Sequence, residues 1–199
     1  MIVSHRHRFI FIKSRKTAGS SIQVALSQLC GEADFISGAG VNRNSLGRGK
    51  VNSNTPAAAV RKLVGEETWK SYFKFVFIRN PWDLTVSRYF YDMQKGRHNI
   101  QDFNVWVRRV RRSTWTGDNL HSYSHIDDEL VADFVGRYEN LAADFEMLCG
   151  HLGIPVTSLG HEKKRHVKRA PYTDYYDETS RKIVATKQQM AIRFFGYSF

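Results

Sequence analysis

Two short stretches of the chain combine cationic side chains with small residues, a combination suited to binding anions. The first, residues 16–21 (KTAGSS), follows the apolar run at residues 9–12 and precedes residues with helix-like spacing. The N–H groups and dipole of a first helical turn attract negative charge, so a strand, a small-residue turn and a helix form an anion cradle. Gly19 lets the backbone approach a ligand closely, and Lys16 adds a positive charge. For this stretch alone, an ordinary strand-to-helix turn is the alternative.

The second stretch is residues 79–83 (RNPWD), which directly follows the apolar run Phe73–Ile78. That run is apolar enough to be buried on both faces, as central parallel strands are. Pro81 suits the start of a helix, where its missing N–H costs nothing. Ligands of open α/β sheets bind outside the carboxyl ends of the strands, so both turns stand where such a ligand is expected.

Together the two turns resemble the cofactor motifs of sulfotransferases that use 3′-phosphoadenosine 5′-phosphosulfate (PAPS). In that family a K-x-x-G-[ST]-S turn holds the 5′-phosphosulfate, and an R-N-P-x-D-x-x-x-S segment holds the 3′-phosphate. Residues 137–141 (RYENL) resemble a strand-end motif of the family. Residues 171–177 and 195–197 resemble the C-terminal part of its carbohydrate-type branch (sulfotransferase family 2-like). The resemblance covers most of the chain.

The resemblance implies roles for individual side chains. Lys16 is expected beside the oxygen that bridges phosphate and sulfuryl group, where it would offset the charge of the leaving group. Arg79 is expected to bind the 3′-phosphate through two hydrogen bonds. The residues expected to bind the cofactor are Lys16, Thr17, Ala18, Gly19, Ser20, Ser21, Arg79, Ser87, Lys168 and Arg169. For Lys168 and Arg169, a solvated basic loop is the alternative.

The general base is not evident from the sequence. The carbohydrate-type branch would place His just before a T-P-A helix start, where this chain has Asn54. Asn has no basic nitrogen at neutral pH, so Asn54 is expected to line the acceptor site. The acceptor proton would then pass to another residue or to water, or the acceptor would be acidic enough to need little help. The candidate bases are His98, His121, His125 and Glu139; the expected catalytic set is Lys16, Asn54 and His125.

Composition suits a single folded domain over residues 1–199. The chain is 42% hydrophobic and has 30 Lys and Arg against 19 Asp and Glu, a formal charge of +11. Such a charge favours anionic partners. The resemblance implies an α/β, P-loop-NTPase-like three-layer fold with a mainly parallel sheet flanked by helices. It also implies sulfuryl transfer to a hydroxyl acceptor, a carbohydrate, by a mechanism that needs no metal.

Two other classes of function stay open at this stage. A kinase-like phosphotransferase would need a Walker A loop with Lys after its second glycine, whereas Lys16 precedes the only glycine of this turn. A non-catalytic basic module could bind sulfated glycan or, less readily, nucleic acid through the basic helix expected at residues 103–112. A solvated helix face is the simpler interpretation of that segment.

Two cysteines, Cys30 and Cys149, lie in apolar contexts typical of buried thiols, although a disulfide remains an alternative. The eight histidines form no zinc pattern. The sequence shows no signal-peptide core and no membrane-spanning run, so a soluble, cytoplasmic protein is expected. Strands are expected at residues 9–12, 33–37, 73–78 and 134–138. Helices are expected at 56–64, with Thr55 as N-cap, and at 103–112, 141–152 and 177–195, and loops at 38–54 and 160–171.

Overall fold

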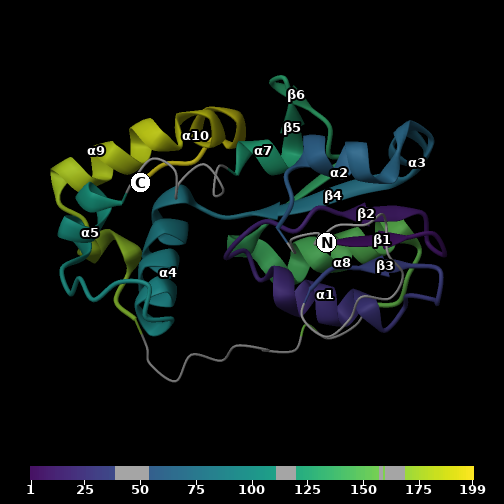
Figure 1. Ribbon diagram of the computed structural model, residues 1–199, viewed down its shortest axis with the longest axis horizontal. Coiled ribbons are helices and arrows are strands. Elements are labelled where there is room, and N and C mark those ends of the chain that lie inside the picture. The colour runs from purple at the N-terminus through teal and green to yellow at the C-terminus, as the bar shows by residue number, and fades with distance from the viewer. Residues whose placement is uncertain (39–53, 111–119, 157–158, 160–168) are drawn as a thin grey trace. The chain divides into compact units, whose positions relative to one another are not determined.

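The computed structural model describes residues 1–38, 54–110, 120–156, 159 and 169–199 (Figure 1). The chain folds as two compact units, each made of two chain segments. The first comprises Met1–Ile78 and Ser122–Lys163, and the second comprises Arg79–His121 and Lys164–Phe199.

The first unit contains a five-stranded sheet in the order β3-β1-β2-β4-β7. Its strands are β1 (Ile2–Ser4), β2 (Phe9–Phe11), β3 (Phe35–Ile36), β4 (Phe73–Ile78) and β7 (Phe134–Arg137). β4 runs parallel to both β2 and β7, whereas β1 runs antiparallel to both β2 and β3. The sheet is therefore mixed: β2, β3, β4 and β7 run in one direction, as expected of a mainly parallel sheet, and β1 runs opposite to them. The prediction missed β1, a strand with two apolar residues that pairs with β2 through a tight connection.

Alternate side chains of the central strands pack on opposite faces of the sheet, as strand geometry requires. Phe11 and Phe75 stack 5.1 Å apart on the face covered by α1 (Gly19–Ser27) and α8 (Leu141–Leu152). Ile10 and Val76 point to the other face, which α2 (Ala57–Val64) and α3 (Glu66–Ser71) cover. The first unit thus has the predicted three layers of helix, sheet and helix (Figure 1).

The second unit is built from helices. They are α4 (Pro81–Gln94), α5 (Phe103–Arg109), η3 (Tyr172–Tyr175), α9 (Glu178–Lys187) and α10 (Gln189–Phe195). Aromatic side chains from α4 and α5 dominate its core, where the rings of Tyr89 and Trp106 lie 5.4 Å apart. The helix predicted at 177–195 is two helices, because the chain leaves helical geometry at Gln188, with φ −111° and ψ 19°.

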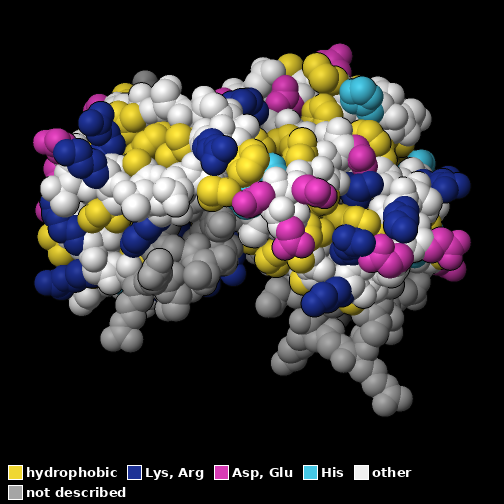
Figure 2. Space-filling model, turned by 90° about the horizontal axis from the view of Figure 1, so that it is seen from above, with side chains coloured by type: hydrophobic (Ala, Val, Ile, Leu, Met, Phe, Trp, Pro, Cys, Tyr) yellow, Lys and Arg dark blue, Asp and Glu magenta, His cyan; other side chains and the backbone are white. Residues whose placement is uncertain are grey.

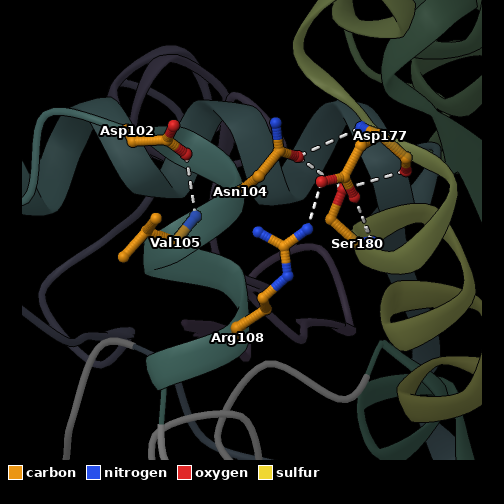
Figure 3. A network of polar contacts seen from close by, with 6 residues as sticks. All are labelled: Asp102, Asn104, Val105, Arg108, Asp177 and Ser180. Atoms are coloured by element: carbon orange, nitrogen blue, oxygen red, sulfur yellow. Dashed lines mark hydrogen bonds and ion pairs between the residues drawn. The ribbon is translucent and has the colours of Figure 1, made fainter.

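A polar network joins α5 to the start of α9 (Figure 3). The Asn104 side-chain oxygen accepts hydrogen bonds from the Asp177 N–H at 3.1 Å and the Ser180 hydroxyl at 2.5 Å. Asp177 also forms an ion pair with Arg108. Hydrogen bonds from the Ser180 N–H and hydroxyl and from Arg108 lower the pKa of the Asp177 carboxyl despite partial desolvation. The basic face of α5 therefore serves packing within this unit, at least through Arg108.

Several boundaries differ from the predictions. Pro56, not Thr55, is the N-cap of α2, which begins at Ala57. The sequence did not predict α3, α7 (His121–Ser124) or the hairpin formed by β5 (His125–Ile126) and β6 (Glu129–Leu130). Cys30 and Cys149 are buried free thiols. Lys168, most of the loops predicted at 38–54 and 160–171, and the last residues of the helix predicted at 103–112 lie outside the described residues. Among the described helices, none is long and apolar enough to cross a membrane.

Candidate functional site

The turn between β2 and α1 has an unusual backbone. Lys16 and Ala18 both have φ of 60°, whereas Thr17 and Gly19 are not among the residues with positive φ. Left-handed geometry is costly for residues with a side chain and persists where surrounding structure enforces it, often at functional sites. Alternation of left- and right-handed residues turns successive N–H groups toward one side and forms an anion-binding concavity. The left-handed geometry at Lys16 and Ala18 is compatible with the cradle expected from the sequence, which stays a prediction.

The N-terminus of α1 adds to this cradle. Ala18 is its N-cap, so no side chain at that position can satisfy the N–H groups of the first turn, and no acidic residue lies in that turn. The helix dipole there favours an anion. A Cβ added at Gly19 would lie 2.8 Å from Lys13 Cγ and 3.3 Å from the Ser14 carbonyl oxygen. The absence of a side chain at Gly19 thus permits the close packing of this helix start on residues 13 and 14.

Ser14 fixes the start of this turn. Its side chain is buried, and its hydroxyl donates a 2.5 Å hydrogen bond to the carbonyl oxygen of Phe77 on β4. The hydroxyls of Ser14 and Thr17 lie 2.8 Å apart. A carbonyl oxygen can only accept, so the Ser14 proton goes to Phe77 and the Thr17 hydroxyl donates to Ser14. Sequence reasoning missed Ser14, because its partner lies 63 positions away in the chain.

A second lysine lies next to the turn. Lys13 Nζ donates to the Gln23 side chain at 2.7 Å, and the Gln23 amide donates in turn to the Ser37 carbonyl at 2.5 Å. These bonds connect the turn after β2, helix α1 and the residue after β3 in one chain of contacts. Lys16 itself is half-buried.

The second predicted turn begins α4. The Asn80 side-chain oxygen caps this helix, accepting from the Trp82 N–H at 3.0 Å and the Asp83 N–H at 3.4 Å. Pro81 occupies the first helical position, as predicted. Unlike the start of α1, this helix start already has a side-chain acceptor. An anion bound there would therefore be held mainly by side chains.

Arg79 is the cation at this turn, and its side chain is only 10% exposed. Its Nε and one terminal nitrogen lie 2.8 Å and 2.7 Å from the same carboxylate oxygen of Asp83. A buried guanidinium needs such a partner, and here the pairing also fixes its orientation. The spacing of four residues between Arg79 and Asp83 was visible in the sequence, but the pair was not predicted.

Other residues predicted to bind the cofactor lie along the same helix. Ser87 is buried and follows Asp83 by four residues, which places both on one side of α4. Phe90 comes three residues later, and the Arg169 guanidinium lies 3.8 Å from the centre of its ring. The second unit therefore brings Arg79, Ser87 and Arg169 to the same helix.

The two predicted catalytic residues besides Lys16 also lie in the first unit. Asn54 is half-buried and comes just before α2. His125 is 5% exposed, its Nδ1 lies 2.9 Å from the Ser124 hydroxyl, and its strand β5 packs on α2. Asn54 thus precedes α2 in the chain, and the strand that holds His125 packs on the same helix.

The other candidate bases have different surroundings. The His98 ring lies against Tyr89 and Trp106, and its Nε2 lies 3.1 Å from the Tyr89 carbonyl oxygen, to which it must donate. Such packing is typical of a structural histidine. His121 is buried and stacks on Phe194 at 4.9 Å. Glu139 is exposed in the short helix η2 (Tyr138–Asn140).

Comparison with known proteins agrees with these motifs. A family model described as "Sulfotransferase family" (sulfotransferase family 2) matches residues 1–198. An uncharacterized protein of Archaeoglobus fulgidus is 34% identical over 104 residues, which cover 50% of this chain and 83% of that protein. No solved structure matches the chain significantly. The chain belongs to the sulfotransferase family.

Proposed function

We propose that this protein transfers the sulfuryl group of PAPS to a hydroxyl group of a carbohydrate. Family membership supports sulfotransfer in general. The observation that carries the choice of donor is the turn at residues 16–18, whose alternating left-handed residues lead into a helix start without a side-chain cap. The chemistry of this turn fits a 5′-phosphosulfate, and Thr17, Ala18, Gly19, Ser20 and Ser21 supply its N–H and hydroxyl donors.

In the proposed reaction, the acceptor oxygen attacks the sulfur atom while the bond between sulfur and the 5′-phosphate oxygen breaks. The products are the sulfate ester and adenosine 3′,5′-bisphosphate, and the acceptor proton passes to a base. Lys16 stabilises the negative charge on the departing phosphate oxygen. Like phosphoryl transfer, this step depends mainly on alignment and charge stabilisation, so the protein needs no covalent nucleophile.

We assign the 3′-phosphate to Arg79, Ser87 and Arg169, together with Lys168. The buried ion pair with Asp83 supports this assignment, because it holds the Arg79 guanidinium in one orientation before the ligand arrives. A guanidinium binds phosphate through two parallel hydrogen bonds. For the acceptor we propose that Asn54 lines its site and that His125, oriented by the Ser124 hydroxyl, accepts its proton.

A basic module without catalytic activity has less support. Arg108, in the last turn of the basic helix α5, forms an ion pair with Asp177. On the face shown in Figure 2, the Lys and Arg side chains of the described residues are interspersed with acidic and apolar ones and form no continuous patch. Binding along a polyanion needs such a patch.

The direct test is transfer of label from PAPS, labelled in its sulfuryl group, to a panel of oligosaccharides. We expect a labelled sulfate ester, and Lys16→Ala should reduce turnover by about 10²- to 10³-fold, the cost of removing one group that stabilises a developing oxyanion. Lys70→Ala, which removes an exposed lysine of α3, is the matched control. Unchanged turnover of Lys16→Ala would contradict the role of Lys16. If Asn54→Ala left acceptor turnover and affinity unchanged, its placement in the acceptor site would be wrong.

A further inference from the structure

Residues 197–199 lie against the turn that carries Arg79. The side-chain amide of Asn80 donates a 2.9 Å hydrogen bond to the carbonyl oxygen of Ser198. The same nitrogen lies 3.3 Å from the hydroxyl oxygen of Tyr172. Since the oxygen of the same amide caps α4, one side chain connects the helix start to residues 197–199.

The ring of Phe199 lies among three other aromatic rings. Its centre is 5.6 Å from Trp82, 5.8 Å from Tyr172 and 5.4 Å from Tyr176, and each pair is close to perpendicular. Edge-to-face contacts of this kind are favourable arrangements of aromatic rings. The Arg181 guanidinium lies 5.3 Å from the ring centre and adds a cation–π contact.

These surrounding residues are themselves bonded to the first turn of α4. The Trp82 indole N–H donates to the Arg181 carbonyl at 3.2 Å. The Tyr176 hydroxyl donates to the Trp82 carbonyl at 2.9 Å, and burial raises its pKa well above the usual range, so it stays protonated as a donor. Phe199 thus completes a cluster that contains a residue of the RNPWD turn.

We infer that residues 197–199 form a positioning element for the 3′-phosphate site, an inference that rests on the proposed function of Arg79. They fix the Asn80 amide, whose oxygen holds the Asp83 N–H, and the Asp83 carboxylate holds the Arg79 guanidinium. Loss of the Phe199 ring removes its contacts with Trp82, Tyr172 and Tyr176. The neighbouring Ser198 carbonyl then holds the Asn80 amide less firmly. The consequence is weaker recognition of a 3′-phosphate, while binding of the 5′ end is unaffected.

The test compares two ligands that differ only in the 3′-phosphate: adenosine 3′,5′-bisphosphate and adenosine 5′-monophosphate. Calorimetric titration gives the ratio of their affinities for each variant. Phe199→Ala should lower the bisphosphate affinity by about tenfold, a change the size of one charge-assisted hydrogen bond, with the monophosphate unchanged. Phe199→Tyr, which keeps the ring, should restore the ratio. Phe194→Ala is the matched control, because Phe194 is 40% exposed and Phe199 38%.

Tyr172→Phe provides a second variant that opens no cavity. It removes the hydroxyl next to the Asn80 amide and should lower the ratio less than Phe199→Ala does. An unchanged ratio in both Phe199→Ala and Tyr172→Phe would overturn the positioning role, as would an equal loss of both ligands, which indicates a general structural effect. A wild-type protein that does not distinguish the two ligands would instead overturn the assignment of the 3′-phosphate to Arg79, and this inference with it.

Discussion

Ser14→Ala tests whether the turn at residues 16–18 depends on its anchor to β4. The substitution removes the donor to the Phe77 carbonyl at 2.5 Å and the acceptor for the Thr17 hydroxyl at 2.8 Å. All three groups belong to buried residues. Leaving a buried polar group without its partner costs about 1–3 kcal/mol, so we expect a loss of about 2 kcal/mol in the free energy of unfolding.

For a chain of this length, that loss corresponds to a fall in Tm of about 4–8 °C. Chemical denaturation and thermal melting without ligand both measure it. The control is Ser27→Ala in α1, which removes a hydroxyl that bonds only locally to the Val24 carbonyl at 2.8 Å. Loss of such a local, exposed bond should change the free energy of unfolding by no more than about 0.5 kcal/mol.

The same variant should also bind adenosine 3′,5′-bisphosphate more weakly, because the left-handed positions of Lys16 and Ala18 lose their support. Two results would refute this reasoning. Ser14→Ala as stable as Ser27→Ala would show that the bond to Phe77 does not stabilise the fold. A destabilised Ser14→Ala with wild-type affinity for the bisphosphate would show that the turn keeps its shape without the anchor.

Two further predictions concern a glycine and a carboxylate of the first unit. Gly136→Ala should destabilise the protein by about 1–3 kcal/mol, because its Cβ would lie 2.3 Å from a ring atom of Phe77, whereas nothing lies within 4 Å of a Cβ added at Gly150. Urea titration measures the free energy of unfolding of both variants, and Gly150→Ala in α8 should leave it unchanged or raise it. Similar losses of this free energy in both variants would contradict the packing argument. Burial alone would raise the pKa of Asp34, but hydrogen bonds from the Gly31, Arg6 and His5 N–H groups and the Ser4 hydroxyl outweigh it and lower that pKa. The stabilisation by Asp34 is therefore complete above the unfolded pKa of about 4 and is lost as pH falls through the folded pKa. In urea titrations at pH 7, Asp34→Asn should have a lower free energy of unfolding than the wild type. If the difference in free energy between the two proteins failed to narrow at acid pH, this argument would be contradicted.

Elements with a strong local signal could be predicted from the sequence. The continuous apolar run of β4 has the predicted bounds, Phe73–Ile78, and α8 ends at Gly153, whose left-handed geometry suits glycine. The first turn of α4 was expected because Pro81 favours a helix start. These features depend on residues close together in the chain.

Features that depend on distant contacts could not be predicted. β1 has two apolar residues, too few for a pattern, and only its pairing with β2 and β3 makes it a strand. The break at Gln188 has no glycine or proline to mark it. The bond from Ser14 to Phe77 joins the turn after β2 to β4, and no local pattern distinguishes Ser14 from any other serine in a loop.

The central claim is that the protein binds a nucleotide with separate 5′ and 3′ anionic groups. Thermal melting with adenosine 3′,5′-bisphosphate or ATP, at low and raised salt, tests it most directly. A ligand at 100 times its Kd stabilises by about 2.7 kcal/mol, so the bisphosphate should raise Tm by about 5–11 °C. The shift should exceed that of ATP, persist at raised salt and disappear in Arg79→Ala but not in Arg109→Ala, which removes an exposed arginine of α5. Equal shifts with both nucleotides that vanish together at raised salt would reveal generic charge attraction and contradict the account.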